Sequence, residues 1–174
     1  TSLPFEGYAL GGLAVGETKT EREDTIEHAA QLLPADKPRY VMGIGTPIDL
    51  LEAVKRGADM FDCILPTALA TQGVAYTSRG KADLRRGVYR SVEHPLDEHC
   101  NCSTCRRFSL AYLHHLVKAK ESIAPQYISI HNLTFYRALI RRMRQAIIEG
   151  SLQDLYEREA PTLMAMDLKY PTAS

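Results

Sequence analysis

The stretch Cys100-Asn-Cys-Ser-Thr-Cys105 decides how the second half of the chain folds, together with His131, which follows after 25 further residues. Three thiols and one imidazole are the ligand set of a closed tetrahedral zinc site, and soft thiolates favour zinc over magnesium or calcium. Four protein ligands leave no coordination position for water. The spacing therefore predicts a structural Zn²⁺ site, with any chemistry located elsewhere in the chain.

Two alternatives remain open on spacing alone. Clustered cysteines in a secreted protein could form disulfides, but Cys100 and Cys102 are too close to bridge easily, and pairing either with Cys105 would leave an odd thiol. The fourth ligand is also undecided, because the chain offers several other histidines: His94, His99, His114 and His115.

Composition limits the other classes of function. The 174 residues suffice for one domain with a real core, or for one and a half smaller units. The formal net charge is zero, but arginines concentrate on both sides of the cysteines, where they could form solvated helix faces or a nucleic-acid footprint. They are Arg85, Arg86, Arg90, Arg106, Arg107, Arg137, Arg141, Arg142 and Arg144.

The chain shows no membrane-spanning run and no signal peptide, so we expect no membrane partner. Metal-type use of cysteine predicts a reducing, cytoplasmic compartment. The chain begins at Thr1 without an initiator methionine, which suggests a segment of a longer protein.

The first third of the chain alternates apolar runs with helical patterns. Strands are expected at 7–11, 40–44 and 60–65, and helices at about 20–33 and 46–56. Thr46 and Pro47 suit the N-cap and first turn of the second helix, and Gly57 suits its end. This order is typical of parallel βα units, but three strands cannot close a (β/α)₈ barrel, which takes about 250 residues.

The pattern changes after Pro66. Residues 74–87 resemble an antiparallel hairpin, and helices are expected at about 103–120 and 132–149. The inward stripe expected on the last helix comprises Leu133, Tyr136, Leu139, Ile140, Met143 and Ile147. The tail 159–174 has no clear pattern. The expected division is 1–66 for the βα units, 67–131 for the hairpin insertion and zinc-binding subdomain, and 132–174 for C-terminal helices and tail.

Asp62 is the candidate catalytic residue, because a lone carboxylate inside an apolar strand is unfavourable unless it is solvated, paired or functional. The carboxyl ends of parallel strands would place Gly11-Gly12, Met42-Gly43 and Asp62 at one edge, where Glu17 could join them. Glycines at that edge would let a flat ligand approach the backbone. The alternative is that Asp62 pairs with an arginine or caps a helix. Cys63 is expected to point into packing on the opposite side.

Four motifs together resemble the tRNA-guanine transglycosylase (queuine tRNA-ribosyltransferase) family in order and spacing. They are Gly11-Gly-Leu-Ala-Val-Gly-Glu17, Arg39-Tyr-Val-Met-Gly-Ile-Gly-Thr-Pro47, Asp59-Met-Phe-Asp-Cys63 and the Cys-x-Cys-x₂-Cys-x₂₅-His cluster. The similarity extends from about Leu3 to Tyr156 and covers the C-terminal half of that family's protein.

This resemblance implies an α/β fold: the C-terminal βα units of a TIM (β/α)₈ barrel with an inserted zinc-binding α+β subdomain. It implies a pentosyltransferase that exchanges guanine at the anticodon wobble position for a 7-deazaguanine precursor of the preQ1 type, in queuosine modification of tRNA. The implied partners are tRNA, the 7-deazaguanine base, and either a second copy in a dimer or a complementing N-terminal half.

The resemblance also assigns roles to residues. Asp62 matches the nucleophile that attacks ribose C1′, and His131 becomes the fourth zinc ligand beside Cys100, Cys102 and Cys105. The implied base pocket uses backbone groups, one carboxylate and stacking, and its residues are Gly12, Leu13, Ala14, Glu17, Met42 and Gly43.

Two departures motivate an alternative. Ala68 and Thr71 stand where the family has arginines in a loop that grips the anticodon. The family's general acid/base aspartate lies in an N-terminal half that this chain lacks, so the isolated fragment is expected to be inactive. The alternative function is a non-catalytic zinc-containing paralogue or partner subunit that binds RNA or a homologous chain. A free-standing zinc interaction domain would not explain the βα units.

Overall fold

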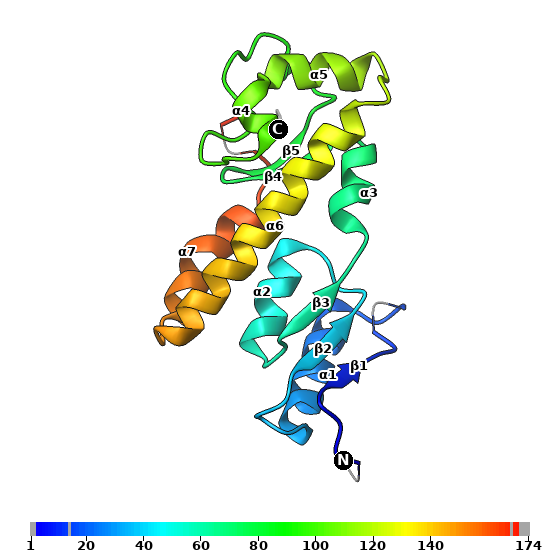
Figure 1. Cartoon of the computed structure of the whole chain (residues 1–174), viewed down its shortest axis with the longest axis vertical. Coiled ribbons are helices and arrows are strands. Elements are labelled where there is room, and N and C mark those ends of the chain that lie inside the picture. The colour runs from blue at the N-terminus through cyan, green and yellow to red at the C-terminus, as the bar shows by residue number, and fades with distance from the viewer. Residues whose placement is uncertain (1–2, 14, 168, 171–174) are drawn as a thin grey trace. The chain divides into compact units, whose positions relative to one another are not determined.

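The computed structural model describes residues 3–13, 15–167 and 169–170 and has two compact units, Thr1–Ile64 and Leu65–Ser174. The first unit is built of βα units (Figure 1). Its elements are β1 (Tyr8–Leu10), α1 (Lys19–Leu32), β2 (Arg39–Met42), α2 (Pro47–Lys55) and β3 (Met60–Asp62). The three strands form one parallel sheet in the order β1-β2-β3, which confirms the expected parallel βα arrangement.

Local signals set the helix ends in this unit. Thr18 and Glu21 form a capping box at the start of α1. The Thr46 hydroxyl accepts from the Asp49 N–H at 3.2 Å and Pro47 opens α2, as the sequence predicts. Gly57 follows α2 with φ +96°, a left-handed conformation that favours glycine after a helix.

The two faces of the parallel sheet differ in exposure. The register Tyr40↔Met60 and Met42↔Asp62 places these four residues on one face, since side chains alternate along a strand. Met42 is 40% exposed and Met60 54%, whereas Val41 on the opposite face is fully buried. Parallel sheets are normally covered on both faces. The face that carries Asp62 is therefore open within the described part of this unit.

The expected strand 60–65 is wrong at its C-terminal end. β3 ends at Asp62, and α3 (Leu65–Thr71) begins with Pro66 in its first turn. Proline is tolerated there because the first helical N–H groups have no partner within the helix. The apolar run therefore contains both the end of a strand and the start of a helix.

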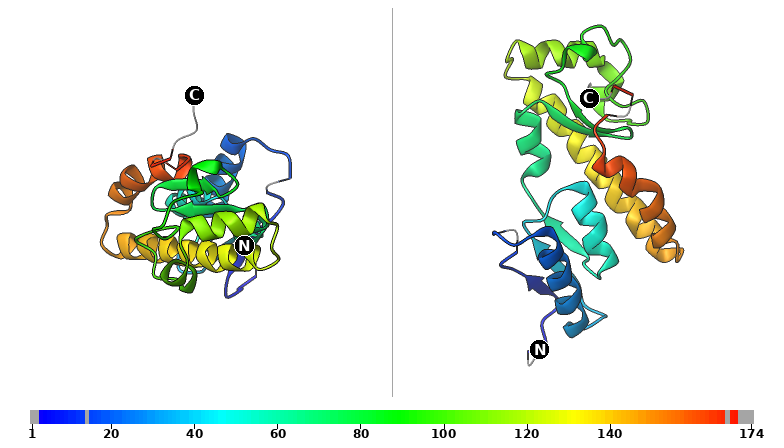
Figure 2. Two further views of the ribbon diagram at one scale, coloured as in Figure 1. Left: turned by 90° about the horizontal axis from the view of Figure 1, so that it is seen from above. Right: turned by 180° about the vertical axis from the view of Figure 1, so that it is seen from behind.

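The second unit surrounds a small hairpin with helices (Figures 1 and 2). Its remaining elements are β4 (Val74–Thr77), β5 (Gly80–Asp83), a 3₁₀ turn at Gly87–Tyr89, α4 (Ser103–Arg107), α5 (Leu110–Lys118), α6 (Ala124–Ile148) and α7 (Leu152–Met164). The antiparallel hairpin is confirmed, with its second strand at 80–83. The core includes Leu84, Tyr89, Leu96, Leu110, Leu113 and Ile128, each fully buried.

The expected helix 103–120 is divided. Phe108 has extended backbone at φ −129° and ψ 140°, and Ser109 then caps α5 by accepting from the Tyr112 N–H at 3.2 Å. The helical pattern alone did not reveal this cap because serine also occurs inside helices.

Helix α6 begins earlier than expected and buries a different stripe. Tyr136, Leu139 and Met143 are buried as predicted, but Leu133, Ile140 and Ile147 are 52%, 37% and 53% exposed. Both faces of α6 carry apolar residues, so periodicity could not identify the inner face.

The expected unpatterned tail is also wrong in part, because 159–164 belong to α7. Leu155, Ala160 and Leu163 of α7 are buried, and α7 lies beside α6 after the turn at Gly150. Beyond α7 the chain returns to the hairpin, where Met166 bridges to Lys81. Among the described residues, no helix is both long and apolar enough to cross a membrane.

Candidate metal centre and candidate active-site carboxylate

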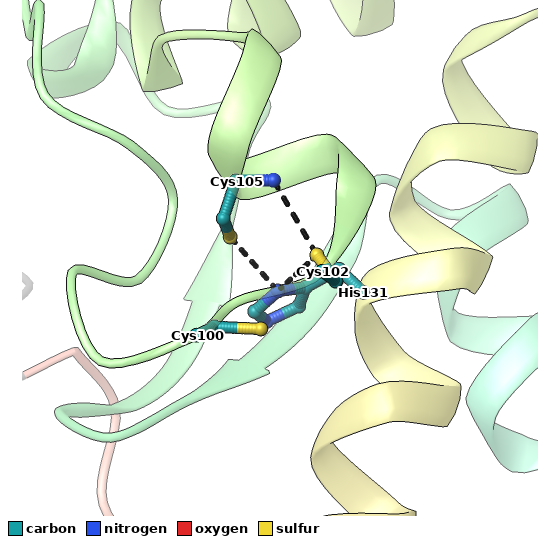
Figure 3. A group of neighbouring side chains, drawn as sticks. All are labelled: Cys100, Cys102, Cys105 and His131. Carbon is teal, nitrogen blue, oxygen red and sulfur yellow. Dashed lines mark hydrogen bonds between the residues drawn. The ribbon is translucent and has the colours of Figure 1, made fainter.

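Cys100, Cys102, Cys105 and His131 lie together in the second unit (Figure 3). Each offers one donor atom, and these atoms all lie within 4.8 Å of one another. Cys102, Cys105 and His131 are buried, and all cysteines of the chain are free thiols. The group could therefore hold a metal ion.

Backbone groups of β4 fix the orientation of His131. The ring Nε2 lies 2.7 Å from the carbonyl oxygen of Tyr76, so an Nε2–H donates there. The Nδ1 then faces the thiols, 3.3 Å from Cys105 Sγ and 3.8 Å from Cys102 Sγ. A hydrogen bond that fixes the tautomer of a ligand histidine in this way is usual at metal sites.

The cysteine loop is fixed by a helix start and a buried carboxylate. Cys102 is the N-cap of α4, and its Sγ accepts from the Cys105 N–H at 3.4 Å. Asp97 is 3% exposed and accepts from Ser78 N–H at 2.7 Å, Ser78 O–H at 2.8 Å and His99 N–H at 2.9 Å. The carbonyl of Asp97 also accepts from the Cys100 N–H at 3.1 Å.

The donor set fits a tetrahedral zinc ion. Bonds of about 2.3 Å to sulfur and about 2.1 Å to nitrogen place tetrahedral ligands roughly 3.6 Å apart, close to the 3.3 and 3.8 Å found between His131 and two of the sulfurs. Burial lowers the pKa of His131, but the sulfurs of Cys100 and Cys102 outweigh it and raise this pKa to about 9. Contact with Cys100 and Cys105 lowers the pKa of the Cys102 thiol. A bound cation would neutralise the negative charge of this thiolate.

The other histidines make different contacts. His94 contacts the hydroxyl of Tyr170 at 3.0 Å, and His114 contacts the carbonyl of Leu84 at 2.6 Å. The candidate metal-binding group in the described residues includes none of His94, His99, His114 or His115.

Asp62 ends β3 in the first unit and is exposed. Its Oδ1 accepts from the Tyr40 hydroxyl at 2.7 Å and from the Gly43 N–H at 3.3 Å. Both donors bind Oδ1, so the other oxygen, Oδ2, has no hydrogen-bond partner among the described residues, and the side chain is exposed. The hydrogen bond to Asp62 raises the pKa of Tyr40, so the phenol stays protonated as a donor.

Glycine turns at the strand ends keep the surroundings of Asp62 open. Gly12 and Gly43 have φ +75° and +77°, and a Cβ on either would meet no atom within 4 Å. A Cβ on Gly11 would lie 2.8 Å from Met42 Cε, so the absent side chain is what lets Met42 lie over this turn. The structure thus brings Met42, Gly43 and Asp62 together through the β2–β3 register.

The remaining predicted pocket residues lie in the loop after β1. Glu17 binds back onto this loop, where its Oε2 accepts from the Val15 N–H at 3.0 Å. Leu13 is half-buried, and Ala14 lies outside the described residues. Cys63 lies 3.9 Å from the carbonyl of Gly45.

The sequence did not single out three residues that position the two sites: Tyr40, Asp97 and Asn132. Asn132 is fully buried, its amide donates to the carbonyls of Pro66 and Val74, and its Oδ1 accepts from the Tyr76 N–H. The one sequence signal for Asn132 was its position next to His131. That signal is weak, because adjacent residues on a helix share a face only in part. Tyr40 lies two residues before Met42, and strand alternation places both on the face of Asp62.

This chain is similar in sequence to known proteins of one family. A sequence model of the family described as Queuine tRNA-ribosyltransferase matches residues 1–163. Proteins with that name are similar to this chain: one from Oleidesulfovibrio alaskensis is 49% identical and one from Nitratidesulfovibrio vulgaris 51% identical, each over 91% of the chain. One from Helicobacter acinonychis is 50% identical over 83% of the chain. The chain spans 42%, 42% and 39% of the lengths of these relatives.

Proposed function

The chain belongs to the queuine tRNA-ribosyltransferase family, and from this membership we propose that it supplies the nucleophile and a structural zinc unit to a tRNA-guanine transglycosylase. The reaction would exchange guanine at the anticodon wobble position for a 7-deazaguanine of the preQ1 type. The observation that carries the proposal is the environment of Asp62, an exposed carboxylate beside glycine turns on an open sheet face.

The contacts of Asp62 suit nucleophilic attack. Tyr40 and Gly43 donate to one carboxylate oxygen, which holds the group in place and leaves the other oxygen for ribose C1′. Attack forms an Oδ–C1′ bond as the C1′–N9 bond breaks, and its electron pair leaves on guanine N9, which takes up a proton. The replacement base then loses its N9 proton and attacks C1′, which releases the Asp62 carboxylate.

The replacement base would be held at the strand ends. Met42 would cover one face of the base, and the backbone of Gly12, Leu13, Ala14 and Gly43 would approach its edge, with Glu17 as a further acceptor. The open conformations of Gly12 and Gly43 support this, because no side chain occupies the space. The residue that moves the proton on N9 is not among these contacts, and we assign it to the remaining part of the family's protein.

The open sheet face supports a place within a larger barrel. Parallel strands need cover on both faces, and the side chains of Met42 and Met60 are exposed on the face of Asp62. We propose that β1 to β3 are the last strands of a (β/α)₈ barrel and that residues supplied by an N-terminal half, or by a second copy, complete the pocket. The isolated chain would then be inactive.

Zinc, when bound by Cys100, Cys102, Cys105 and His131, would supply structural cross-linking. The four ligands would leave no open position for substrate, so the unit holds the hairpin, α4 and α6 together. Free thiols in such a cluster favour a reducing compartment such as the cytoplasm.

Asp62→Asn tests the nucleophile in the complete protein that carries this chain. The amide cannot form the ester, so the covalent tRNA adduct should disappear from denaturing gels, and labelled guanine exchange into tRNA should fall by about 10³-fold or more. Zinc content should not change, because Asp62 is outside the metal cluster.

Asp59→Asn is the matched control, since Asp59 lies in the same motif but its Oδ2 accepts from the Arg39 backbone N–H. This variant should still form the adduct. An adduct trapped with Asp62→Asn would refute the assignment.

A second function is favoured by one observation. Ala68 and Thr71 lie in α3 where arginines of the anticodon-binding loop are expected, so this chain could be a non-catalytic partner subunit that binds RNA or a homologous chain. Labelled guanine exchange distinguishes the two proposals, because a partner subunit alone would incorporate none.

A further inference from the structure

A cleft of about 620 Å³ lies in the second unit between α6, α7, the hairpin turn and the loop before α4. Its wall combines three arginines, Arg141, Arg142 and Arg158, with the carboxylates of Asp97 and Glu159. Hydroxyl groups of Thr77, Ser78 and Thr162 and the apolar Phe135, Ala138 and Leu163 complete much of the lining. We call this the arginine cleft. None of these residues takes part in the proposed chemistry at Asp62.

The two carboxylates in the arginine cleft are already engaged. Glu159 accepts from Arg142 Nε at 2.7 Å and Nη2 at 2.8 Å, which is a bidentate pair. Asp97 receives the three hydrogen bonds from Ser78 and His99 described above. Neither carboxylate therefore has a free oxygen of the kind that would recruit a cation.

Two of the three guanidinium groups have N–H donors that make no hydrogen bond within the described residues. Arg158 is 66% exposed, and its Nη2 lies 3.9 Å from Glu159, which is beyond hydrogen-bond distance. Arg141 is exposed and makes no ion pair or hydrogen bond within the described part of the chain. The cleft therefore presents two guanidinium groups, from two adjacent helices, that make no hydrogen bond within the described residues; Arg158 makes only a long ion pair with Glu159, and Arg142 is already neutralised.

We infer that the arginine cleft binds a phosphate of the RNA backbone, at a position of the tRNA apart from the base being exchanged. Guanidinium forks match the oxygens of a phosphate, and Arg141 and Arg158 come from separate helices that a backbone could cross. A volume of about 620 Å³ suits a nucleotide, and the hydroxyls and apolar residues suit a ribose. The cleft would replace cationic contacts that Ala68 and Thr71 do not supply.

This inference rests on the proposed function for the identity of the RNA. Affinity for tRNA and base exchange are measured separately, so the two proposals can fail independently. Asp62→Asn should bind tRNA like the wild type, whereas arginine-cleft variants of the complete protein that carries this chain should raise KM for tRNA and leave kcat unchanged.

The test uses Arg141→Ala, Arg158→Ala and the double variant in the full chain, with a tRNA that has guanine at the wobble position as the probe. Fluorescence anisotropy would give Kd over a range of salt. Each single variant should weaken binding about 5-fold, and the slope of log K against log[salt] should fall by about 0.9 for each arginine removed. Arg141→Lys and Arg158→Lys should recover the salt slope, because they keep the charge.

Arg144→Ala is the matched control, because Arg144 is exposed on the same helix, has no partner in the described residues and does not line the cleft. It should keep wild-type affinity. The inference is overturned if Arg144→Ala weakens binding as much as Arg141→Ala, if the double variant binds like the wild type, or if the wild-type chain binds no tRNA. Preferential binding of an acidic peptide such as polyglutamate, with no tRNA binding, would also overturn it.

Discussion

The side chains of two adjacent residues bind the backbone polar groups of Tyr76 in the middle of β4. Asn132 accepts from its N–H and His131 donates to its carbonyl, so α6 is fastened to the hairpin by both. His131 thereby serves two purposes, because the same hydrogen bond that satisfies Tyr76 turns Nδ1 toward the thiols. Because this contact joins residues 55 positions apart, spacing alone could single out the three cysteines as candidate ligands but could not separate His131 from the other histidines.

Asp97→Asn should destabilise the second unit by about 1–3 kcal/mol at pH 7, because the amide cannot accept from three donors as a carboxylate does. Burial by itself raises the pKa of Asp97, but the hydrogen bonds from the N–H groups of Ser78 and His99 have the larger combined effect and lower it. The pKa of Asp97 therefore lies below its usual value. The carboxylate therefore contributes stability above its unfolded pKa of about 3.9, and this contribution is lost as pH falls through the lower folded pKa.

Urea unfolding of wild type and Asp97→Asn at several pH values checks this. The difference in free energy of unfolding between the wild type and Asp97→Asn should be constant from pH 8 to 5 and should approach zero below about pH 4. The exposed Asp154 is the control, because Asp154→Asn should lose only the helix N-terminal charge effect, less than about 1 kcal/mol. A difference that already closes between pH 8 and 5 would contradict the role given to Asp97.

At the scale of elements, the segment after α7 completes the hairpin. Lys81 donates its N–H to the carbonyl of Ala165 and accepts from the N–H of Asp167, so 165–167 add a short bridge beside β5. Gly80 makes this approach possible, because a Cβ there would lie 2.7 Å from the Met166 carbonyl oxygen. No local pattern predicts this contact, since 165–167 have neither a strand pattern nor a turn motif.

Gly80→Ala should lower the free energy of unfolding by about 2 kcal/mol or more. The reason is twofold: the backbone has φ +110°, and the added methyl would meet two carbonyl oxygens within 2.8 Å. Chemical denaturation followed by circular dichroism measures the change. Gly87→Ala is the matched control, because a Cβ at Gly87 meets nothing within 4 Å, and it should change stability by less than about 1 kcal/mol. Equal effects at both glycines would exclude the close approach at Gly80 as the cause.

At the scale of the whole molecule, positive and negative charges are equal in number but unevenly distributed. The net charge is zero, while exposed arginines gather on α4 and α6 of the second unit. The chain spans about two fifths of the length of the relatives it matches, and its parallel sheet has an exposed face. The second unit, in contrast, has its own core and its own candidate metal site.

Removal of zinc should therefore unfold the second unit. Chelation under reducing conditions should lower its free energy of unfolding by several kcal/mol, because metal binding to such clusters is coupled to folding. His131→Ala should lose the metal, whereas His99→Ala should retain it, since His99 lies beside the cluster without belonging to it. Zinc content after dialysis measures both, and metal retained by His131→Ala would exclude His131 as a ligand.

The same site predicts the direction of its pH dependence. The pKa of His131 in the metal-free cluster is raised to about 9, so below that pH zinc must displace a proton from the ring. Affinity should rise with pH from 6 toward 9, and calorimetry in buffers of different ionisation enthalpy should detect proton release. An affinity that is independent of pH across this range would contradict it.

The sequence by itself determined the βα order, the α2 cap, the hairpin and the three cysteines of the candidate metal cluster, whereas His131 was assigned only through the resemblance to a family. Caps, strand periods and ligand types act over a few residues, so they can be recognised without a tertiary structure. Only the tertiary structure decided which face of α6 is buried, where α4 ends and α5 begins, and that α7 exists at all. It also brought Tyr40 to Asp62 and Asn132 to β4. These outcomes depend on contacts between residues as far as 66 positions apart, which no local pattern records.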